Sequence, residues 1–242
     1  MSQAAIRVLE DPAAAVAEAL AAAAGAGRQI VLTGGSTPRA AYERAASLDA
    51  DWSGASVWFG DERCVAPDHE QSNFGMAKRA LLDGLSNGGP RVHRIEGERG
   101  PEDGARAYER ELREAFGDGT PRFDLILLGL GPDAHCASLF PRADALGEQE
   151  RLAVGVNTPG MAPLVPRVTL TLPVLDAARE VVFLVAGEDK AEAVRRAFAS
   201  PPDPDAPASL VAPVDGPLTV LLDEAAASRL PPERRPEPEG VG

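Results

Sequence analysis

One histidine lies where a parallel α/β protein would carry an acid–base catalyst. The chain has three histidines, and His135 follows the apolar run 123–128 within a glycine-containing segment. The ordinary pKa of histidine suits proton transfer near neutral pH. A lone histidine is more often structural, whereas one on a loop after a buried strand is well placed to act on a ligand. From the residues alone, both roles stay open.

Glycines follow an earlier apolar run, residues 29–33, and suggest a site for an anion. Gly34 and Gly35 allow the backbone to approach a ligand closely, and a helix start at Ser36 or Thr37 offers free N–H groups. This arrangement suits a phosphate group. The alternative is an ordinary glycine turn in which Ser36 or Thr37 only caps the helix.

Charged residues occur at two other strand ends. Asp61, Glu62 and Arg63 directly follow the run 56–59, although such a cluster is also common in solvated turns. Lys190, one of two lysines against 22 arginines, lies near the start of a helix after the run 181–186. A cation there opposes the helix dipole unless acidic neighbours or a bound anion compensate it. We therefore interpret Lys190 as a candidate anion ligand.

Other kinds of chemistry fit the sequence less well. The spacing of Gly129, Gly131 and Ala134 matches a dinucleotide fingerprint, but Pro132 and Pro141 obstruct the long helix that must follow it. A serine or cysteine nucleophile lacks the G-x-S-x-G elbow. The three histidines show no spacing typical of metal ligands. We expect neither a cofactor nor a metal.

The elements that position these residues are predicted from hydrophobic runs. Short runs rich in Val, Ile and Leu alternate with longer Ala-rich helical patterns, which is typical of stacked βα units. Most runs lack a period of two, as expected for strands covered on both faces. The pattern predicts an α/β fold with a mainly parallel, doubly wound sheet. The predicted strands are residues 29–33, 56–59, 92–95, 123–128, 152–156, 167–171, 181–186 and 218–222.

Proline and capping residues predict where helices begin. Asp11 with Pro12, and Thr37 with Pro38, are typical of first helical turns. The predicted helices are residues 11–24, one from 37, 72–85, 101–116, 189–198 and 224–230. Residues 200–207 are predicted to form a surface loop. We expect a single domain over 1–230 and a flexible proline- and charge-rich tail over 231–242.

Charge and composition limit the partners. The formal net charge of −13 repels phosphate backbones, so we expect no nucleic-acid binding. No apolar run approaches the roughly 20 residues needed to cross a bilayer, and the first residues lack a secretory signal. Two cysteines cannot build a disulfide framework. We expect a cytoplasmic protein that does not bind membranes.

Several motifs in fixed order resemble the 6-phosphogluconolactonase family, over about residues 5 to 230. They are LTGGSTP at 32–38, GDER at 60–63, SNFGM at 72–76, GLGPDAHCASLFP at 129–141, PRVTLT at 166–171 and GEDK at 187–190. Together they are far more specific than any single motif. The family usually has glycine at the position of Ala134 and threonine at that of Cys136. If that glycine adopts a positive φ, Ala134 carries a steric cost.

The resemblance implies a fold shared with glucosamine-6-phosphate deaminases and hydrolysis of 6-phospho-D-glucono-1,5-lactone to 6-phosphogluconate in the oxidative pentose phosphate pathway. It implies no cofactor and a monomer or weak homodimer. The candidate catalytic residues are His135 as general base and then acid, Asp61 as its support, and Arg63 at the oxyanion or the substrate. The candidate substrate-binding residues are Gly34, Gly35, Ser36, Thr37, Arg63, Arg167 and Lys190.

Two other functions fit the same residues. One is a sugar-phosphate isomerase or amino-sugar deaminase on the same fold, which would use a carboxylate for enediol chemistry. The other is a non-catalytic sensor that binds a sugar phosphate.

Overall fold

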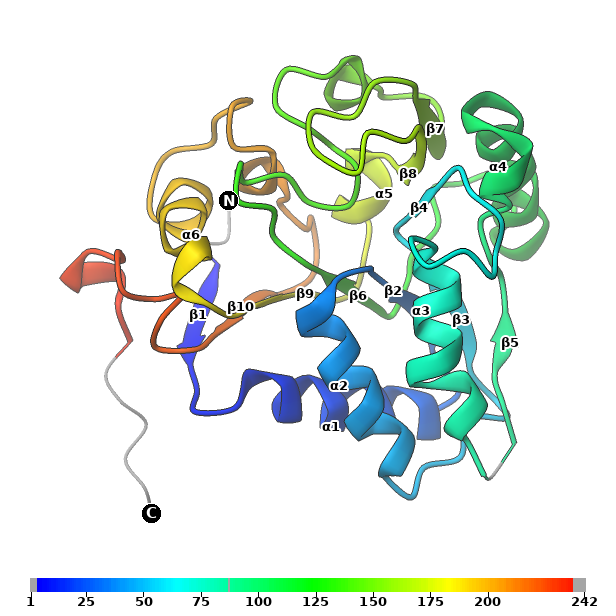
Figure 1. Ribbon diagram of the computed structural model, residues 1–242, viewed down its shortest axis with the longest axis horizontal. Helices are drawn as coiled ribbons and strands as arrows, with labels where there is room; N and C mark the ends of the chain where they lie inside the picture. The colour runs from blue at the N-terminus through cyan, green and yellow to red at the C-terminus, as the bar shows by residue number, and fades with distance from the viewer. Residues whose placement is uncertain (1–3, 87, 237–242) are drawn as a thin grey trace.

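A seven-stranded sheet runs through the centre of the computed structural model, which describes residues 4–86 and 88–236 (Figure 1). All its neighbouring strands are parallel. Every residue of the central strands β6 and β9 is buried, which explains why their sequences do not alternate. In spatial order the strands are β1 (Ala5–Val8), β10 (Leu218–Leu222), β9 (Val181–Val185), β6 (Leu125–Leu128), β2 (Gln29–Leu32), β3 (Ser56–Phe59) and β5 (Arg91–Val92).

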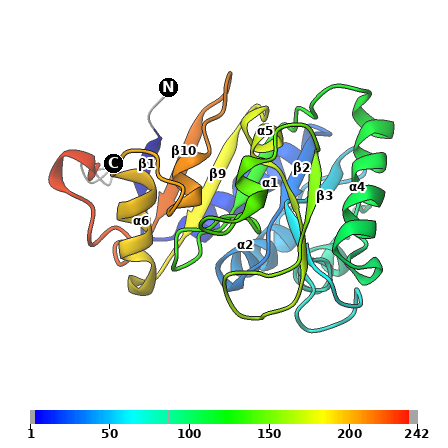
Figure 2. The ribbon, with the colours of Figure 1, turned by 90° about the horizontal axis from the view of Figure 1, so that it is seen from above.

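Helices cover both faces of this sheet. The side chain of Asp11 accepts a hydrogen bond from Ala14 N at 3.1 Å and caps α1, whose first residue is Pro12. Helices α1 and α2 lie side by side on one face, whereas α5 and α6 lie on the other (Figure 1). Figure 2 shows α6 and α4 at opposite ends of the sheet. The helices are α1 (Pro12–Gly25), α2 (Ser36–Ser47), α3 (Asn73–Ala80), α4 (Pro101–Phe116), α5 (Leu172–Asp176) and α6 (Ala191–Phe198).

A second, three-stranded sheet lies beside the predicted, mainly parallel one, and the sequence did not predict it. Its strands β4 (Asp61–Arg63), β8 (Arg167–Leu170) and β7 (Ala153–Val156) pair antiparallel. The ten residues between β7 and β8 contain no helix, so they are too short for the crossover that parallel neighbours need. The hairpin therefore forms its own sheet, and β4 joins its edge.

Four further elements differ from the sequence prediction. Strand β1 and helix α5 were missed. Strand β1 is a partly exposed edge strand without a continuous apolar run, and α5 has only five residues, too few for a helical period. Strand β5 ends at Val92, where the sequence predicted a strand beginning. Residues 224–230 form turns rather than the predicted helix. The carboxylate of Asp223 binds Ala226 N, Leu230 N bonds back only three residues, and the prolines that follow prevent a helix from continuing.

The ends of the predicted loop and tail also have structure. In the loop 200–207, residues 201–204 are exposed as expected, but Ala206 and Pro207 are buried. In the tail, Pro232–Arg234 form a 3-10 turn, and Arg234 Nη2 donates to Phe198 O at 2.7 Å. Residues 237–242 of the predicted tail lie outside the described residues. The domain boundary at residue 230 stays a prediction.

The strand order places a crevice between β2 and β6. From β2 the chain moves to β3 and β5 on one side, and then from β6 to β9 and β10 on the other. Ligands of doubly wound sheets bind at the carboxyl ends of the strands where the order reverses in this way. The segments that begin at Thr33 and Gly129 meet at this point. Across residues 4–86 and 88–236, no helix has the length and apolar character required to span a membrane.

Candidate active site

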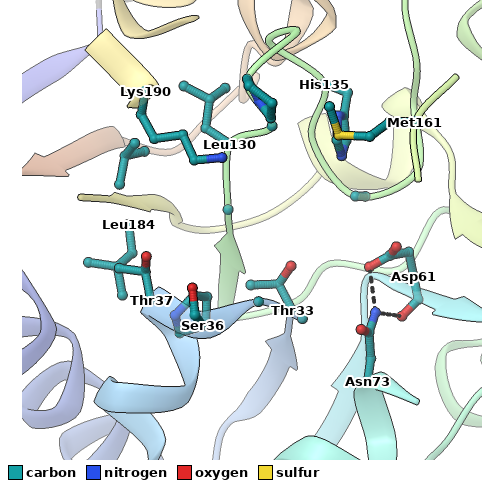
Figure 3. A pocket seen from close by; sticks show the side chains of 18 of the residues that line it. Thr33, Ser36, Thr37, Asp61, Asn73, Leu130, His135, Met161, Leu184 and Lys190 are labelled. Carbon is teal, nitrogen blue, oxygen red and sulfur yellow. Dashed lines mark hydrogen bonds between the residues drawn. The ribbon is translucent and has the colours of Figure 1, made fainter. Parts of the chain in front are cut away.

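A cavity of about 220 Å³ opens at the carboxyl ends of β2, β6 and β9 (Figure 3). It brings together segments that lie more than 150 residues apart in the chain. All nine residues that the sequence predicted as catalytic or substrate-binding line it: Gly34, Gly35, Ser36, Thr37, Asp61, Arg63, His135, Arg167 and Lys190. Their individual roles stay predictions.

His135 is paired with Asp133. The distance from His135 Nδ1 to Asp133 Oδ1 is 2.5 Å, and the imidazole is largely buried beside the ring of Phe140. An ionised carboxylate can only accept, so Nδ1 carries the proton and Nε2 is left free to take one. Burial opposes ionisation of Asp133, but the hydrogen bond and charge of His135 outweigh it and hold the pKa of Asp133 below its ordinary value.

This pairing bears on the role predicted for Asp61, which was to orient or electrostatically support His135. The carboxylate that contacts the ring nitrogen is Asp133, so electrostatic support is the role left to Asp61, and it stays a prediction. The spacing Asp-x-His was visible in the sequence, but an aspartate two residues away is also an ordinary turn residue. Gly131 makes room for the pair, because a Cβ there would lie 2.0 Å from His135 Nδ1.

The loop that carries His135 has an unusual backbone. Ala134, Ala137 and Arg142 all have positive φ, at 68°, 48° and 57°. Ala134 therefore has the positive φ on which its predicted steric cost depends, since side chains with a Cβ avoid this region. Cys136, next to His135, is fully buried, and burial raises the pKa of its thiol far above the ordinary value. A protonated, buried thiol is a poor nucleophile.

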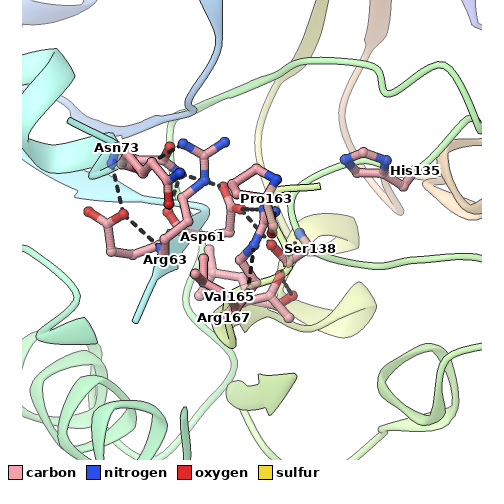
Figure 4. A network of polar contacts seen from close by, with 12 residues as sticks. Asp61, Arg63, Asn73, His135, Ser138, Pro163, Val165 and Arg167 are labelled. Atoms are coloured by element: carbon pink, nitrogen blue, oxygen red, sulfur yellow. Dashed lines mark hydrogen bonds and ion pairs between the residues drawn. The ribbon is translucent and has the colours of Figure 1, made fainter. Parts of the chain in front are cut away.

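Asp61 is the centre of a buried polar network (Figure 4). Its side chain accepts hydrogen bonds from Ser138 Oγ at 2.6 Å and Asn73 Nδ2 at 3.0 Å. The Nη1 atom of Arg167 lies 4.0 Å from the same carboxylate. Asp61 itself is only 4% exposed, so these contacts replace the water that an ionised group needs. They hold a fixed negative charge at one side of the cavity.

Glu62 stabilises the same network through its contacts with the start of α3. It accepts four hydrogen bonds, from Ser72 Oγ and from the backbone N–H groups of Arg63, Asn73 and Phe74. Burial raises its pKa, and these bonds oppose that shift. Three of the donors belong to the start of α3, so Glu62 anchors the helix that presents Asn73 to Asp61. Sequence reasoning assigned no role to this residue.

Two arginines lie on the Asp61 side of the cavity. Arg167 is 3% exposed, and its Nε and Nη2 donate to Val165 O and Pro163 O at 3.3 and 3.1 Å. Burial lowers the pKa of Arg167, and Asp61 opposes that shift, so the guanidinium stays charged. Arg63 Nη1 donates to Gln71 O at 2.7 Å. Both side chains add positive charge where Asp61 meets the cavity.

The opposite side of the cavity suits an anion. Ser36 and Thr37 begin α2, whose N-cap Gly35 has a φ of 115° and supplies no capping side chain. In Figure 3, Lys190 points down beside Leu130, above Ser36 and Thr37, and Asp61 lies toward the other side of the view. The Nζ atom of Lys190 lies 3.8 Å from Asp189. Lys190 and Arg167 both line the cavity, and their joint binding of one phosphate stays a prediction.

Gly34 connects the two sides of the cavity. A Cβ at Gly34 would lie 2.0 Å from Asn73 Oδ1, so only glycine allows this loop to pass so close to the Asp61 network. Within residues 4–86 and 88–236, no group of three or more His, Cys, Asp or Glu residues is arranged to hold a metal.

A buried histidine–carboxylate pair and a helix start that meet in one cavity at a sheet switch point are typical of an enzyme site for a small ligand. Residues 2–220 match the family described as glucosamine-6-phosphate isomerases/6-phosphogluconolactonase, and the chain belongs to this family. A 6-phosphogluconolactonase from Synechocystis sp. is 42% identical over 208 residues, which cover 84% of this chain and 85% of the relative.

Solved structures agree with this family. A 6-phosphogluconolactonase from Leishmania guyanensis has 31% identity and a TM-score of 0.79, covering 93% of this chain and 98% of that one. A monomeric glucosamine-6-phosphate deaminase has the same TM-score at 21% identity, covering 94% and 100%, which shows the shared fold alone. The predicted family and fold are confirmed, and the predicted lactonase activity is supported.

Proposed function

We propose that this protein hydrolyses 6-phospho-D-glucono-1,5-lactone to 6-phospho-D-gluconate, a step of the oxidative pentose phosphate pathway. The observation that carries the proposal is the His135–Asp133 pair in one cavity with Lys190 and with residues 33–37, the segment that leads into α2 and is called the α2 loop below. A cavity of about 220 Å³ suits a single small substrate. The sequence similarity to 6-phosphogluconolactonases supports the same substrate.

His135 acts twice on the proton of one water molecule. Its free Nε2 removes a proton as the water oxygen attacks the lactone carbonyl, which produces a tetrahedral oxyanion. The bond from this carbon to the ring oxygen then breaks, and His135 returns the proton to that oxygen. The product is an open-chain acid. Asp133 stabilises the imidazolium that forms between the two transfers.

The charged residues divide between the two ends of the substrate. Ser36, Thr37 and Lys190 bind the phosphate through backbone N–H groups and one ammonium. Arg63 lies nearer the reacting carbonyl and stabilises the oxyanion. Arg167 pairs with Asp61 and thereby stabilises the side of the cavity that contacts the sugar. The predicted support of His135 by Asp61 becomes, in this proposal, an electrostatic effect across the cavity.

The deciding experiment measures hydrolysis of freshly generated lactone by the purified protein in the presence of a chelator. Wild type should exceed the spontaneous rate, and His135→Ala should lose about 10²- to 10⁴-fold in kcat. His69→Ala is the matched control, because His69 is exposed and does not line the cavity. No acceleration by wild type, with tight binding of 6-phosphogluconate, would favour a sensor. Interconversion of aldose and ketose phosphates would favour an isomerase.

The phosphate assignment has its own test. Lys190→Ala should raise KM about 10- to 100-fold with little change in kcat, because a hydrogen bond to a charged group contributes about 1.5–3 kcal/mol. Hydrolysis of unphosphorylated glucono-1,5-lactone should be unaffected by the same substitution. An equal loss with both lactones would overturn the assignment.

We also propose a cytoplasmic location and a monomer or weak homodimer. Both cysteines are free thiols, which suits a reducing compartment. The exposed large hydrophobic residues of the described chain come from four separate segments, whereas an obligate interface needs a continuous apolar centre. Light scattering at micromolar concentration should give the mass of one chain.

A further inference from the structure

The loop that carries His135 depends on contacts from outside itself. Within the described residues, Ala134, Ala137 and Arg142 are the three non-glycine positions with positive φ, and all lie between 134 and 142. Each is conformationally unfavourable for a residue with a Cβ. Such a backbone persists only when surrounding structure holds it in place. The position of His135 is therefore set partly by whatever holds this loop.

A distant segment, residues 203–210, supplies several of these contacts. Ala208 N donates to Ala134 O at 3.0 Å. The carboxylate of Asp205 receives two hydrogen bonds from Arg142, at 2.5 and 2.7 Å. The Arg142 side chain is 79% exposed, so water screens this ion pair and it stabilises the loop only weakly.

The segment is itself well ordered by internal hydrogen bonds. Asp203 N donates to Ser209 Oγ, and Asp205 N donates to Asp203 Oδ1, both at 2.8 Å. Ala206 and Ala208 are each 1% exposed. The segment thus offers a fixed surface against which the loop of His135 can rest, although its proline- and aspartate-rich sequence suggested an exposed loop.

Arg196 of α6 joins the two segments. Its Nη1 donates to Asp133 O at 3.4 Å, and its Nη2 donates to Asp205 O. One planar guanidinium therefore spans the carbonyl of the residue that binds His135 and the carbonyl of the supporting segment. Arg196 does not line the cavity, so it acts on the substrate only through the loop.

The same helix also faces the phosphate side of the site. Lys190 directly precedes α6, and Arg196 lies six residues further along the chain. The apolar face of α6 packs into the core. The helix therefore links the backbone at Lys190, the proposed phosphate ligand, to the loop that holds His135.

We infer that Arg196 is a positioning residue that places His135 relative to the bound phosphate by tying Asp133 O to the supporting segment 203–210. This inference rests on the proposed function. It assigns Arg196 an effect on the reaction step, because a displaced imidazole binds substrate no worse but reaches the water less well. Substrate binding through Lys190 and the α2 loop stays intact.

The test compares Arg196→Ala with Arg195→Ala, its exposed neighbour, which pairs only with Glu192 among the described residues. We expect Arg196→Ala to lower kcat about 10- to 100-fold, because the imidazole of His135 would be displaced by about 1 Å. KM and the inhibition constant of 6-phosphogluconate should stay within twofold of wild type. Arg195→Ala should match wild type in all three. Arg196→Lys should lower kcat by a smaller factor, because one ammonium cannot span both carbonyls.

Hydrogen exchange keeps this test separate from the proposed function. In Arg196→Ala, amides of residues 129–142 should exchange faster, including Gly131 N, which donates to His135 O at 2.9 Å. Faster exchange confined to this loop supports the positioning role of Arg196 even if wild type does not hydrolyse the lactone. Unchanged exchange and kcat in folded Arg196→Ala would overturn it, as would KM rising in step with falling kcat. If that variant does not fold, wild-type kcat and exchange in Arg196→Lys would overturn it instead.

Discussion

Gly131→Ala tests how strictly the His135–Asp133 pair must be placed. The new Cβ would lie 2.0 Å from His135 Nδ1 and 2.7 Å from Asp133 Oδ1. Ordinary contact needs about 3.5 Å, so the imidazole must retreat by about 1.5 Å. His135 Nδ1 lies 2.5 Å from Asp133 Oδ1, and this hydrogen bond breaks if the ring moves that far. A misplacement of about 1 Å costs about 10²-fold, so kcat should fall about 100-fold or more.

The assay is lactone hydrolysis under saturating substrate, with thermal unfolding measured alongside. Gly131 has no positive φ, so the substitution acts on the pair rather than on its own backbone. Gly147→Ala is the matched control, because a Cβ there has no neighbour within 4 Å among the described residues. It should retain wild-type kcat. A folded Gly131→Ala protein with kcat within threefold of wild type would refute the assigned role of the pair.

Three other predictions follow from buried or strained residues. Ala134→Gly should change stability by less than about 0.5 kcal/mol in urea unfolding, because relief of about 1–2 kcal/mol of backbone strain offsets the lost methyl group and the greater flexibility of glycine. The equally buried Ala55→Gly, without positive φ, should lose about 1.5 kcal/mol. Glu62→Gln should destabilise the fold by about 1–3 kcal/mol, because its amide would face backbone N–H donors, whereas Glu98→Gln on the surface should have little effect. Asp133→Asn should lower kcat about tenfold or more. It should also make the free energy of unfolding depend less on pH at acid pH. The pKa of Asp133 is depressed in the folded state, so its contribution to stability is present above the unfolded pKa of about 4 and is lost as pH falls through the folded value.

Each of these predictions has a clear contrary result. Equal losses at Ala134 and Ala55 would mean that positive φ carries no strain here. Full stability of Glu62→Gln would mean that its four hydrogen bonds do not anchor α3. An Asp133→Asn protein with unchanged kcat and the same acid unfolding midpoint as wild type would remove the charge of Asp133 from the argument.

Much of the main sheet could be predicted because its signals are local. A strand buried on both faces is a continuous apolar run, and Leu125–Leu128 and Val181–Val185 stand out for that reason. The antiparallel sheet was not recognised because β4 consists of three charged residues, Asp61–Arg63, whose burial depends on pairing with β8. Nothing in a short charged segment distinguishes such a strand from a solvated turn.

By itself the sequence determined which residues reach the site. His135, the Gly34 loop and Lys190 each follow an apolar strand, and parallel strands deliver their carboxyl ends to one edge of the sheet. The order of motifs then identified the family. These inferences succeed because each rests on neighbours within one βα unit.

Only the tertiary structure decided which residues act on one another. Asp61, Asn73 and Ser138 meet in one network, and Arg196 reaches Asp133 across 63 positions of sequence. Such contacts depend on how separate βα units dock, and no local pattern encodes that geometry. The partner of His135 combines both kinds of information. Asp133 is only two residues from His135, so their contact is local, whereas the hydrogen bond that commits Asp61 to Ser138 joins residues 77 positions apart and depends on packing.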